Sequence, residues 1–131
     1  NVLSALRKQT NGKLIVVLGA GGNRDSEKRP FMGAKSEKYA DTLIVTDDNP
    51  RDEDPSLIRK ALIGGLKDKT KLVEISNRES AIQEAVNLST SSDTIAVLGK
   101  GHETTQETAG RVVDFDDANY LLKFLQEKFG K

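Results

Sequence analysis

The chain has 131 residues, 36% of them hydrophobic, and its 20 lysines and arginines balance 20 aspartates and glutamates, with one histidine and no cysteine. This length is that of one ordinary domain with its own core, and the lack of cysteine excludes disulfides, thiolate metal sites and cysteine nucleophiles. Zero net charge argues against nucleic-acid binding, and the longest apolar run, residues 14–18, is too short to cross a bilayer.

The first residues lack the hydrophobic stretch of a signal peptide and instead show helical spacing of apolar side chains at Val2, Leu3 and Leu6. We therefore expect a soluble, cytoplasmic domain that has no contact with a membrane. Because the chain begins with Asn1 and enters this pattern directly, we also expect it to be part of a longer protein, with much of the function upstream.

Short apolar runs alternate with segments of helical spacing. The runs typical of strands buried on both faces are residues 13–18, 42–46, 72–75 and 94–98. The segments with helical spacing are residues 30–40, 55–67 and 77–89. This alternation predicts an α/β fold, a Rossmann-like doubly wound domain in which helices cover both faces of a mostly parallel sheet.

Residues that favour helix starts stand where these helices begin. Pro30 and Pro55 suit a first helical turn, and Asp54 and Asn77 can cap the backbone N–H groups that follow them. The predicted helix boundaries therefore agree with the local residue types.

The chain after residue 99 is more polar. We expect an edge strand at residues 111–115 and a last helix that is capped by Asp116 or Asp117 and runs through Phe129. Since no repeat or linker divides the chain, residues 1–131 are expected to form a single domain.

The loop after the first predicted strand is rich in glycine, from Gly19 to Gly22, and continues with Arg24. Glycines let backbone N–H groups approach a ligand closely. The dinucleotide fingerprint would need glycine where Arg24 stands, and no P-loop motif occurs in the chain. The loop is either a tight turn or, with Arg24, Lys28 and Arg29, an anion site.

The second predicted strand ends in Asp47, Asp48, Asn49, Pro50 and Arg51. Asp, Asn and Pro are ordinary turn residues, so a solvated turn is one interpretation. The other depends on Arg51, because a guanidinium can hold a carboxylate with two hydrogen bonds.

The fourth predicted strand ends in Gly99, Lys100, Gly101, His102 and Glu103. A lone histidine is more often structural than catalytic, and it cannot form a zinc site without further ligands. We expect no metal at His102, whereas Glu103 could receive a cation.

In a parallel sheet, the loops that follow the strands meet at one edge, where ligands bind. Cationic Arg24 and Arg51, with Asp48 or Glu103 as an anionic acceptor, suit a zwitterion such as an amino acid. The sequence shows no nucleophile beside a base, no carboxylate pair with acid/base spacing and no metal cluster. We therefore expect a binding domain without catalytic residues or a metal site of its own.

Three motifs in order, G-x-G-G-x-R-D-x-x-K-R-P at residues 19–30, D-D-N-P-R at 47–51 and G-K-G-H-E at 99–103, resemble the carboxy-terminal domain of Mur ligases. The similarity extends over nearly the whole chain. It is strongest to the branch of the family that adds the third residue of the peptidoglycan stem peptide, a step on which cell-wall synthesis, cell shape and cell division depend.

The resemblance implies the third domain of a three-domain ligase. The full-length enzyme would use ATP and Mg²⁺, bound mainly by the absent central domain, to join an amino acid to UDP-N-acetylmuramoyl-L-Ala-D-Glu. The partners of this domain would then be the amino acid, the uridine nucleotide dipeptide, and the central and N-terminal domains of the same chain. Without the P-loop, this domain alone is predicted to be inactive.

The D-N-P-R motif further implies meso-diaminopimelate as the amino acid, because lysine-adding relatives generally lack the arginine. Arg24 and Arg51 would bind carboxylates, and Glu103 with the Gly99 carbonyl would bind the distal ammonium. By motif match, the substrate-binding residues implied by the resemblance are Arg24, Asp48, Asn49, Pro50, Arg51, Gly99 and Glu103.

Three alternatives remain at this point: a lysine-adding ligase of the same family, a ligase that makes another polymer such as cyanophycin or polyglutamate, and an unrelated nucleotide-binding or small-ligand domain of Rossmann-like fold. The upstream sequence would discriminate among them, because a P-loop preceded by a uridine-nucleotide domain would establish the class.

Overall fold

The computed structural model describes residues 2–23, 26–99, 105–108, 110–114 and 116–130. The helices are α1 (Val2–Gln9), α2 (Arg29–Tyr39), α3 (Pro55–Ile63), α4 (Arg78–Leu88) and α5 (Asp117–Phe129), with short 3-10 helices η1 (Ser26–Lys28) and η2 (Lys69–Lys71). The strands are β1 (Leu14–Leu18), β2 (Thr42–Val45), β3 (Leu72–Glu74), β4 (Thr94–Leu98), β5 (Thr105–Thr108) and β6 (Arg111–Asp114).

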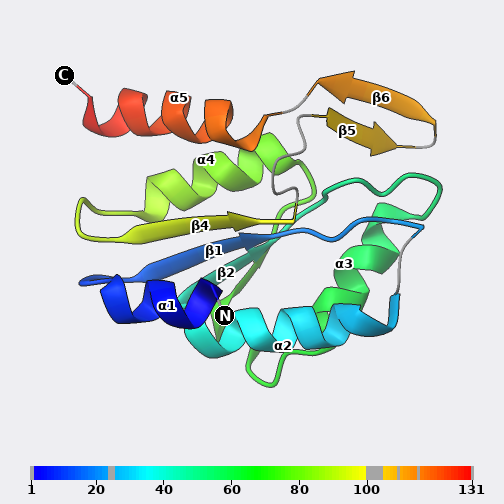
Figure 1. The fold of residues 1–131 in the computed structure, drawn as a ribbon, viewed down its shortest axis with the longest axis horizontal. Helices are drawn as coiled ribbons and strands as arrows, with labels where there is room; N and C mark the ends of the chain where they lie inside the picture. Colours follow the sequence, from blue (N-terminus) through cyan, green and yellow to red (C-terminus); the bar gives the residue numbers. More distant parts are fainter. Residues whose placement is uncertain (1, 24–25, 100–104, 109, 115, 131) are drawn as a thin grey trace.

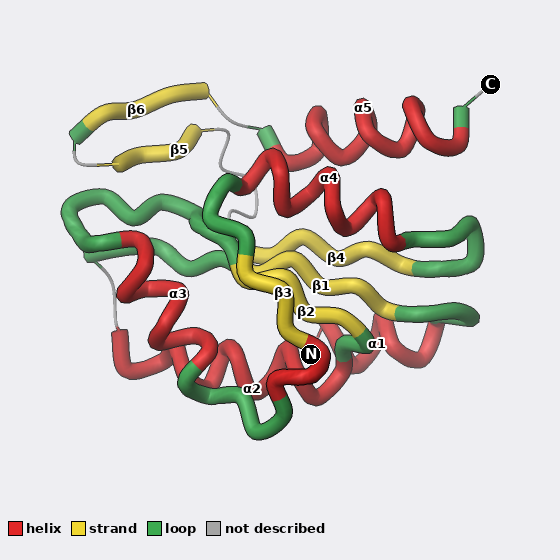
Figure 2. The backbone as a smooth tube through the Cα atoms, turned by 180° about the vertical axis from the view of Figure 1, so that it is seen from behind, coloured by secondary structure: helices red, strands yellow, loops and turns green. Residues whose placement is uncertain are grey.

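The core of the fold is a parallel sheet with the strand order β3-β2-β1-β4. In its register, Val16 of β1 pairs with Leu43 of β2 and with Ala96 of β4. Helices α1, α2 and α3 lie on one face of the sheet, and α4 and α5 lie on the other (Figures 1 and 2). The predicted doubly wound α/β architecture is confirmed.

Strand β1 divides its side chains between two hydrophobic clusters. Leu14, Val16 and Leu18 pack with the helices of the α1–α3 face, while Ile15 and Val17 pack against α4 and α5. Each β1 side chain is therefore buried, as its uninterrupted apolar run predicts. Burial on both faces does not hold for β3 and β4, the outer strands of this sheet. Strand β3 is only partly buried and contains the exposed Glu74, and in β4 only Ala96 is fully buried.

The predicted helix caps are confirmed by hydrogen bonds. The Asp54 side chain accepts from the Ser56 N–H at 2.9 Å and the Asn77 side chain from the Ser80 N–H at 2.8 Å. Asp116 rather than Asp117 caps α5. Each cap satisfies N–H groups that have no partner inside the helix.

Helix α3 ends at Ile63, four residues before the predicted end at residue 67. The chain continues through Gly64 and Gly65, which have low helix propensity. A Cβ atom at Gly65 would collide with the carbonyl oxygen of Pro30, so glycine lets this turn pack closely against the start of α2.

The strand predicted at residues 111–115 is observed as β6, but it does not join the parallel sheet. It pairs antiparallel with β5 in a separate two-stranded sheet, with Arg111 opposite Thr108. Strand β5 has the sequence TQET and was missed because it has no alternation of apolar and polar residues. The last residue of the predicted strand, Phe115, lies outside the described residues.

Helix α5 lies along α4 on the outer side of the sheet (Figure 1). The Lys128 ammonium of α5 donates hydrogen bonds to the carbonyl oxygens of Val86, Asn87 and Ser89 at 3.0, 2.8 and 2.6 Å. This cation satisfies carbonyl groups at the end of α4 and fixes the two helices to each other. Among the described helices, none combines the length and apolar character needed to span a membrane.

Candidate functional site

The carboxyl ends of β1, β2 and β4 are in direct contact. The Gly19 N–H after β1 donates to the Leu98 carbonyl of β4 at 3.2 Å. A Cβ atom on Gly19 would lie 3.1 Å from the Asp47 carbonyl carbon, and one on Gly99 would press on the Gly19 carbonyl. From β1 the chain adds β2 and β3 on one side of the sheet, and then β4 on the other side. Open α/β sheets bind ligands at such a point, here between β1 and β4.

The loop after β1 and the loop after β2 run side by side beyond the sheet (Figures 1 and 2). The Gly22 N–H donates to the Asn49 carbonyl at 2.6 Å, and the Arg51 guanidinium donates to the Gly22 carbonyl at 3.1 Å. A side chain at position 22 would collide with the Pro50 carbonyl, so glycine is required for this approach. The glycine-rich segment therefore serves to dock one loop on the other.

Within the D-D-N-P-R segment, Asp48 and Asn49 are almost fully buried, at 3% and 2% exposure, and Pro50 is buried as well. Arg51 is half-buried, and its backbone has a φ of 53°, in the left-handed region. A non-glycine residue in that region costs about 1–2 kcal/mol, and such strain is found most often at functional sites. These burial values contradict the interpretation of the segment as a solvated turn.

An ion pair between buried Arg29 and the partly exposed Glu53 joins the same two segments. Arg29, which is 4% exposed, donates through both terminal nitrogens to the two carboxylate oxygens of Glu53 at 3.0 and 2.8 Å, and also to the Gly21 carbonyl at 3.0 Å. Glu53 accepts a further hydrogen bond from the Asn23 N–H at 2.5 Å. The Arg29 guanidinium and this N–H together hold the pKa of Glu53 below its usual value.

The expectation that Arg29 binds an external anion is therefore wrong. Its guanidinium is buried and is taken by the carboxylate of Glu53. Lys28, the one lysine of that expected anion site, is exposed at the end of η1. Arg24 lies outside the described residues.

The two aspartates of the D-D-N-P-R segment have different surroundings. The Asp47 carboxylate accepts from the Arg59 guanidinium of α3 at 2.5 Å, and Arg59 also pairs with Glu74 of β3 at 2.9 Å. Burial raises the pKa of Asp47, although Arg59 opposes this shift. Asp47 therefore connects the loop to the neighbouring elements, while Asp48 is the more deeply buried of the two.

The structure identifies Arg78, at the start of α4, as a residue that sequence reasoning missed. Its fully buried side chain holds Asp117 of α5 with two hydrogen bonds of 2.7 and 2.8 Å. It also donates to the carbonyl oxygens of Asp47 at 3.0 Å and Leu98 at 3.2 Å. The carbonyls belong to the residues just before Asp48 and Gly99, and only the contacts between distant segments reveal this role.

Of the predicted substrate-binding residues, the structure places Asp48, Asn49, Pro50, Arg51 and Gly99 at one edge of the sheet. Gly99 has a φ of 124°, which suits glycine, and it lies against Gly19. Arg24 and Glu103 lie outside the described residues, as does His102.

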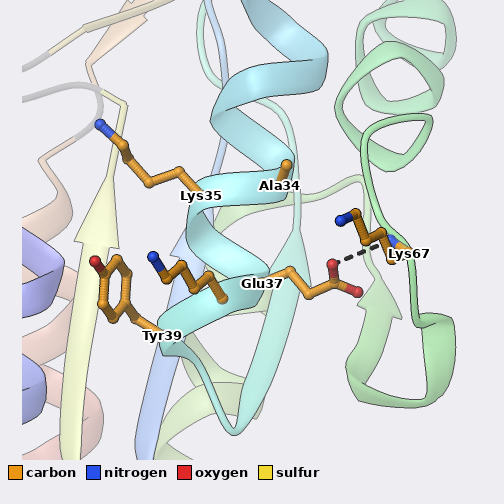
Figure 3. A pocket seen from close by; sticks show the side chains of 6 residues that line it. Ala34, Lys35, Glu37, Tyr39 and Lys67 are labelled. Atoms are coloured by element: carbon orange, nitrogen blue, oxygen red, sulfur yellow. Dashed lines mark hydrogen bonds between the residues drawn. The ribbon is translucent and has the colours of Figure 1, made fainter.

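A hollow on the α2 side of the sheet is lined by Ala34, Lys35, Glu37, Lys38, Tyr39 and Lys67 (Figure 3). The Glu37 carboxylate accepts hydrogen bonds from the backbone N–H groups of Lys67 at 3.0 Å and Asp68 at 2.7 Å. It therefore holds the chain after α3 against α2. The hollow lies beside the end of α2, which leads into the start of β2, so it is separate from the carboxyl ends of the strands.

The described residues do not fit the metal and nucleotide of the expected reaction. No group of three or more His, Cys, Asp or Glu side chains in this part of the chain is arranged to hold a metal ion. The sequence also has no P-loop to hold the phosphates of ATP.

A model of the family described as "Mur ligase, glutamate ligase domain" matches residues 1–101 of the chain. Among curated proteins, the UDP-N-acetylmuramoyl-L-alanyl-D-glutamate--2,6-diaminopimelate ligase of Caulobacter vibrioides is 51% identical over 125 residues, which cover 95% of this chain and 25% of the relative. The ligase of the same name from Aquifex aeolicus is 47% identical over 125 residues, which cover 95% of this chain and 26% of the relative.

A solved structure of a UDP-N-acetylmuramoyl-L-alanyl-D-glutamate--2,6-diaminopimelate ligase superposes with a TM-score of 0.90 and 34% identity, covering 97% of this chain and 26% of that structure. The chain therefore spans about a quarter of the length of the proteins it matches, 25–26% for these relatives. The family match contradicts the alternative of an unrelated nucleotide-binding or small-ligand domain.

Proposed function

The chain belongs to the Mur ligase family through its glutamate ligase domain, and from this membership we propose that it is the amino-acid-binding domain of a ligase that joins meso-diaminopimelate to UDP-N-acetylmuramoyl-L-Ala-D-Glu. In this proposal, residues 1–131 form the carboxy-terminal domain of a three-domain cytoplasmic enzyme. Its partners are the two substrates and the central and N-terminal domains of the same chain.

One observation carries the proposal for the amino acid. Arg51 lies where the loops after β1 and β2 meet, at the edge of the sheet that suits ligand binding, and its backbone is held in the left-handed region. Diaminopimelate differs from lysine by a second carboxylate at its far end. A guanidinium at this position can hold that carboxylate with two hydrogen bonds.

The remaining substrate-binding residues are assigned by the family motifs. We propose that Arg24 binds another carboxylate of the amino acid and that Glu103 and the Gly99 carbonyl bind its distal ammonium. Asp48, Asn49 and Pro50 form the buried turn from which Arg51 emerges. These residues would orient the amine for attack and are not expected to move a proton.

When bound, ATP and Mg²⁺ supply the activation of the D-glutamate carboxylate that the amine attacks. We propose that the central domain holds both, because the described residues of this domain do not fit them. The contribution of this domain is to bind and orient the amino acid.

The full-length protein is expected to prefer meso-diaminopimelate to L-lysine by at least about a hundredfold in kcat/KM, because a site built around a polar group rejects an analogue that lacks its partner. The measurement is ligation of each amino acid to UDP-N-acetylmuramoyl-L-Ala-D-Glu in the presence of ATP and Mg²⁺. A preference for lysine would favour the lysine-adding alternative. No turnover with either amino acid, but extension of a polyamide, would favour the ligases of other polymers.

The isolated domain, residues 1–131, is expected to fold but to have no ligase or ATPase activity. It contains hydrophobic clusters on both faces of its sheet, whereas it lacks a P-loop. Circular dichroism of the purified domain would report the fold, and phosphate release with all substrates present would report activity. Turnover by a folded domain would contradict the assignment of the chemistry to the central domain.

A further inference from the structure

The Glu53 carboxylate joins the two segments of the site through several hydrogen bonds, and none of the sequence motifs includes Glu53. It accepts two hydrogen bonds from the Arg29 guanidinium at 3.0 and 2.8 Å and one from the Asn23 backbone N–H at 2.5 Å. Both partners belong to the segment after β1, while Glu53 belongs to the segment after β2. One carboxylate therefore fixes the distance between the two segments.

Glu53 also closes the turn that carries Arg51. Its backbone N–H donates to the Pro50 carbonyl at 3.0 Å, so Arg51 is the second residue of a four-residue turn. In this turn Arg51 has a φ of 53°, a backbone conformation that is unfavourable for residues other than glycine. Such a conformation persists only where the surrounding contacts hold it.

On the opposite loop, Asn23 has a φ of 54° and its side chain donates to the Asp52 carboxylate at 3.1 Å. The two left-handed residues, Asn23 and Arg51, thus belong to the two segments that Glu53 joins through the Asn23 N–H and that the Gly22 N–H joins through the Asn49 carbonyl. A change at Glu53 would move both sides of the junction.

We propose that Glu53 is a positioning residue for amino-acid selection: through Arg29 and the Asn23 N–H, it holds the turn that aims the Arg51 guanidinium at the distal carboxylate. This inference rests on the proposed function, because it needs Arg51 to read the substrate. Glu53 itself does not contact the amino acid.

Glu53 can hold the two segments together because its partner, Arg29, is buried. Arg29 is only 4% exposed, so its charge depends on the Glu53 carboxylate for compensation. Glutamine in place of Glu53 has nearly the same shape, but its amide nitrogen cannot accept a hydrogen bond and would face a guanidinium N–H. The two segments would then shift apart locally, while the core of the sheet would remain packed.

The chain offers a second carboxylate–arginine pair as a control at the other end of the sheet, with an arginine side chain that is 35% exposed, against 5% for Arg29. Asp41 also pairs with an arginine, Arg7, at 2.7 Å, and also accepts a backbone N–H, that of Leu14, at 2.8 Å. This pair joins α1 to the start of β2, far from the carboxyl ends of the strands. Asp41→Asn therefore reports the cost of losing such a pair without affecting the loops of the site.

The experiment compares full-length wild-type, Glu53→Gln and Asp41→Asn proteins. Glu53→Gln is expected to raise KM for diaminopimelate by about tenfold to a hundredfold and to lower the preference for diaminopimelate over lysine, with KM for ATP unchanged. Asp41→Asn is expected to lower the melting temperature but to leave KM for diaminopimelate within about twofold of wild type. Arg29→Lys keeps the charge without the planar fork and should give an intermediate KM.

Equal KM values for diaminopimelate in Glu53→Gln and Asp41→Asn would overturn the inference, and so would a parallel rise in KM for ATP. If Glu53→Gln does not fold, Arg29→Lys provides the same comparison. The wild-type measurement distinguishes a failure of the proposed function from a failure of the role of Glu53. Wild-type protein that does not use diaminopimelate contradicts the proposed function, whereas a selective wild type with an unaffected Glu53→Gln contradicts only the role of Glu53.

Discussion

Replacing Arg51 by alanine in the full-length protein is expected to remove the preference for diaminopimelate over lysine. The wild-type guanidinium gains a charge-assisted pair with the diacid and is left without that partner when lysine binds. Losing this pair should lower kcat/KM for diaminopimelate by a factor that corresponds to roughly 2–4 kcal/mol of transition-state stabilisation. For lysine, kcat/KM should fall little further or rise. The quantity to measure is the ratio of the two kcat/KM values before and after the substitution.

Two control variants distinguish between two roles of Arg51, selection of the substrate and support of the loop. Arg51→Lys retains a positive charge without the bidentate fork and should recover only part of the preference. Lys60→Ala removes an exposed cation of α3 and should leave the ratio unchanged. If Arg51→Ala lowers the efficiency with both amino acids by the same factor, Arg51 supports the loop through its bond to the Gly22 carbonyl and does not select the substrate.

Arg78→Met is expected to lower the free energy of unfolding of the chain by about 3–5 kcal/mol, because it leaves Asp117 without its counter-ion and removes the Arg78 donor from the Asp47 carbonyl. The Leu98 carbonyl also loses Arg78 but keeps its bond from the Gly19 N–H. Methionine keeps most of the volume of the side chain, so the loss reports hydrogen bonds and charge more than a cavity. Urea unfolding of wild type and variant, followed by circular dichroism, measures the difference.

The double variant Arg78→Met with Asp117→Leu is expected to be more stable than Arg78→Met alone, since it removes the unpaired carboxylate. Lys69→Met changes an exposed cation of η2 and should alter the free energy of unfolding by no more than about 0.5 kcal/mol. A loss below about 1 kcal/mol for Arg78→Met would mean that water replaces the lost bonds and that Arg78 does not hold the strand ends together.

Arg78 also connects the last helix to two of the loops that are proposed to bind the amino acid. Arg78 fixes the carbonyl groups of Asp47 and Leu98, which precede Asp48 and Gly99 in the chain. Its carboxylate partner, Asp117, lies at the start of α5. The last helix of the domain is therefore coupled through one buried side chain to two of the loops that are proposed to bind the amino acid.

The sequence alone determined the fold class and most element boundaries, because these depend on interactions between residues close in the chain. The apolar run of β1 and the N-caps Asp54 and Asn77 are local signals, and each was confirmed. The prediction was wrong where a local signal was misread or absent. The glycines after Ile63 end α3 early, and the polar TQET segment gave no sign of pairing with β6.

The tertiary structure alone showed what Arg29 and Arg78 bind. In the sequence, Arg29 and Arg51 are equivalent candidates for binding an anion, and Arg78 has no distinguishing neighbour. The partner of a long charged side chain is chosen by segments that fold next to it: Glu53 lies 24 residues from Arg29 and Asp117 lies 39 residues from Arg78. Both arginines are buried, and a buried charge needs its counter-ion within the protein. Such contacts depend on the packing of the whole sheet, and no periodic pattern of residues in the sequence predicts them.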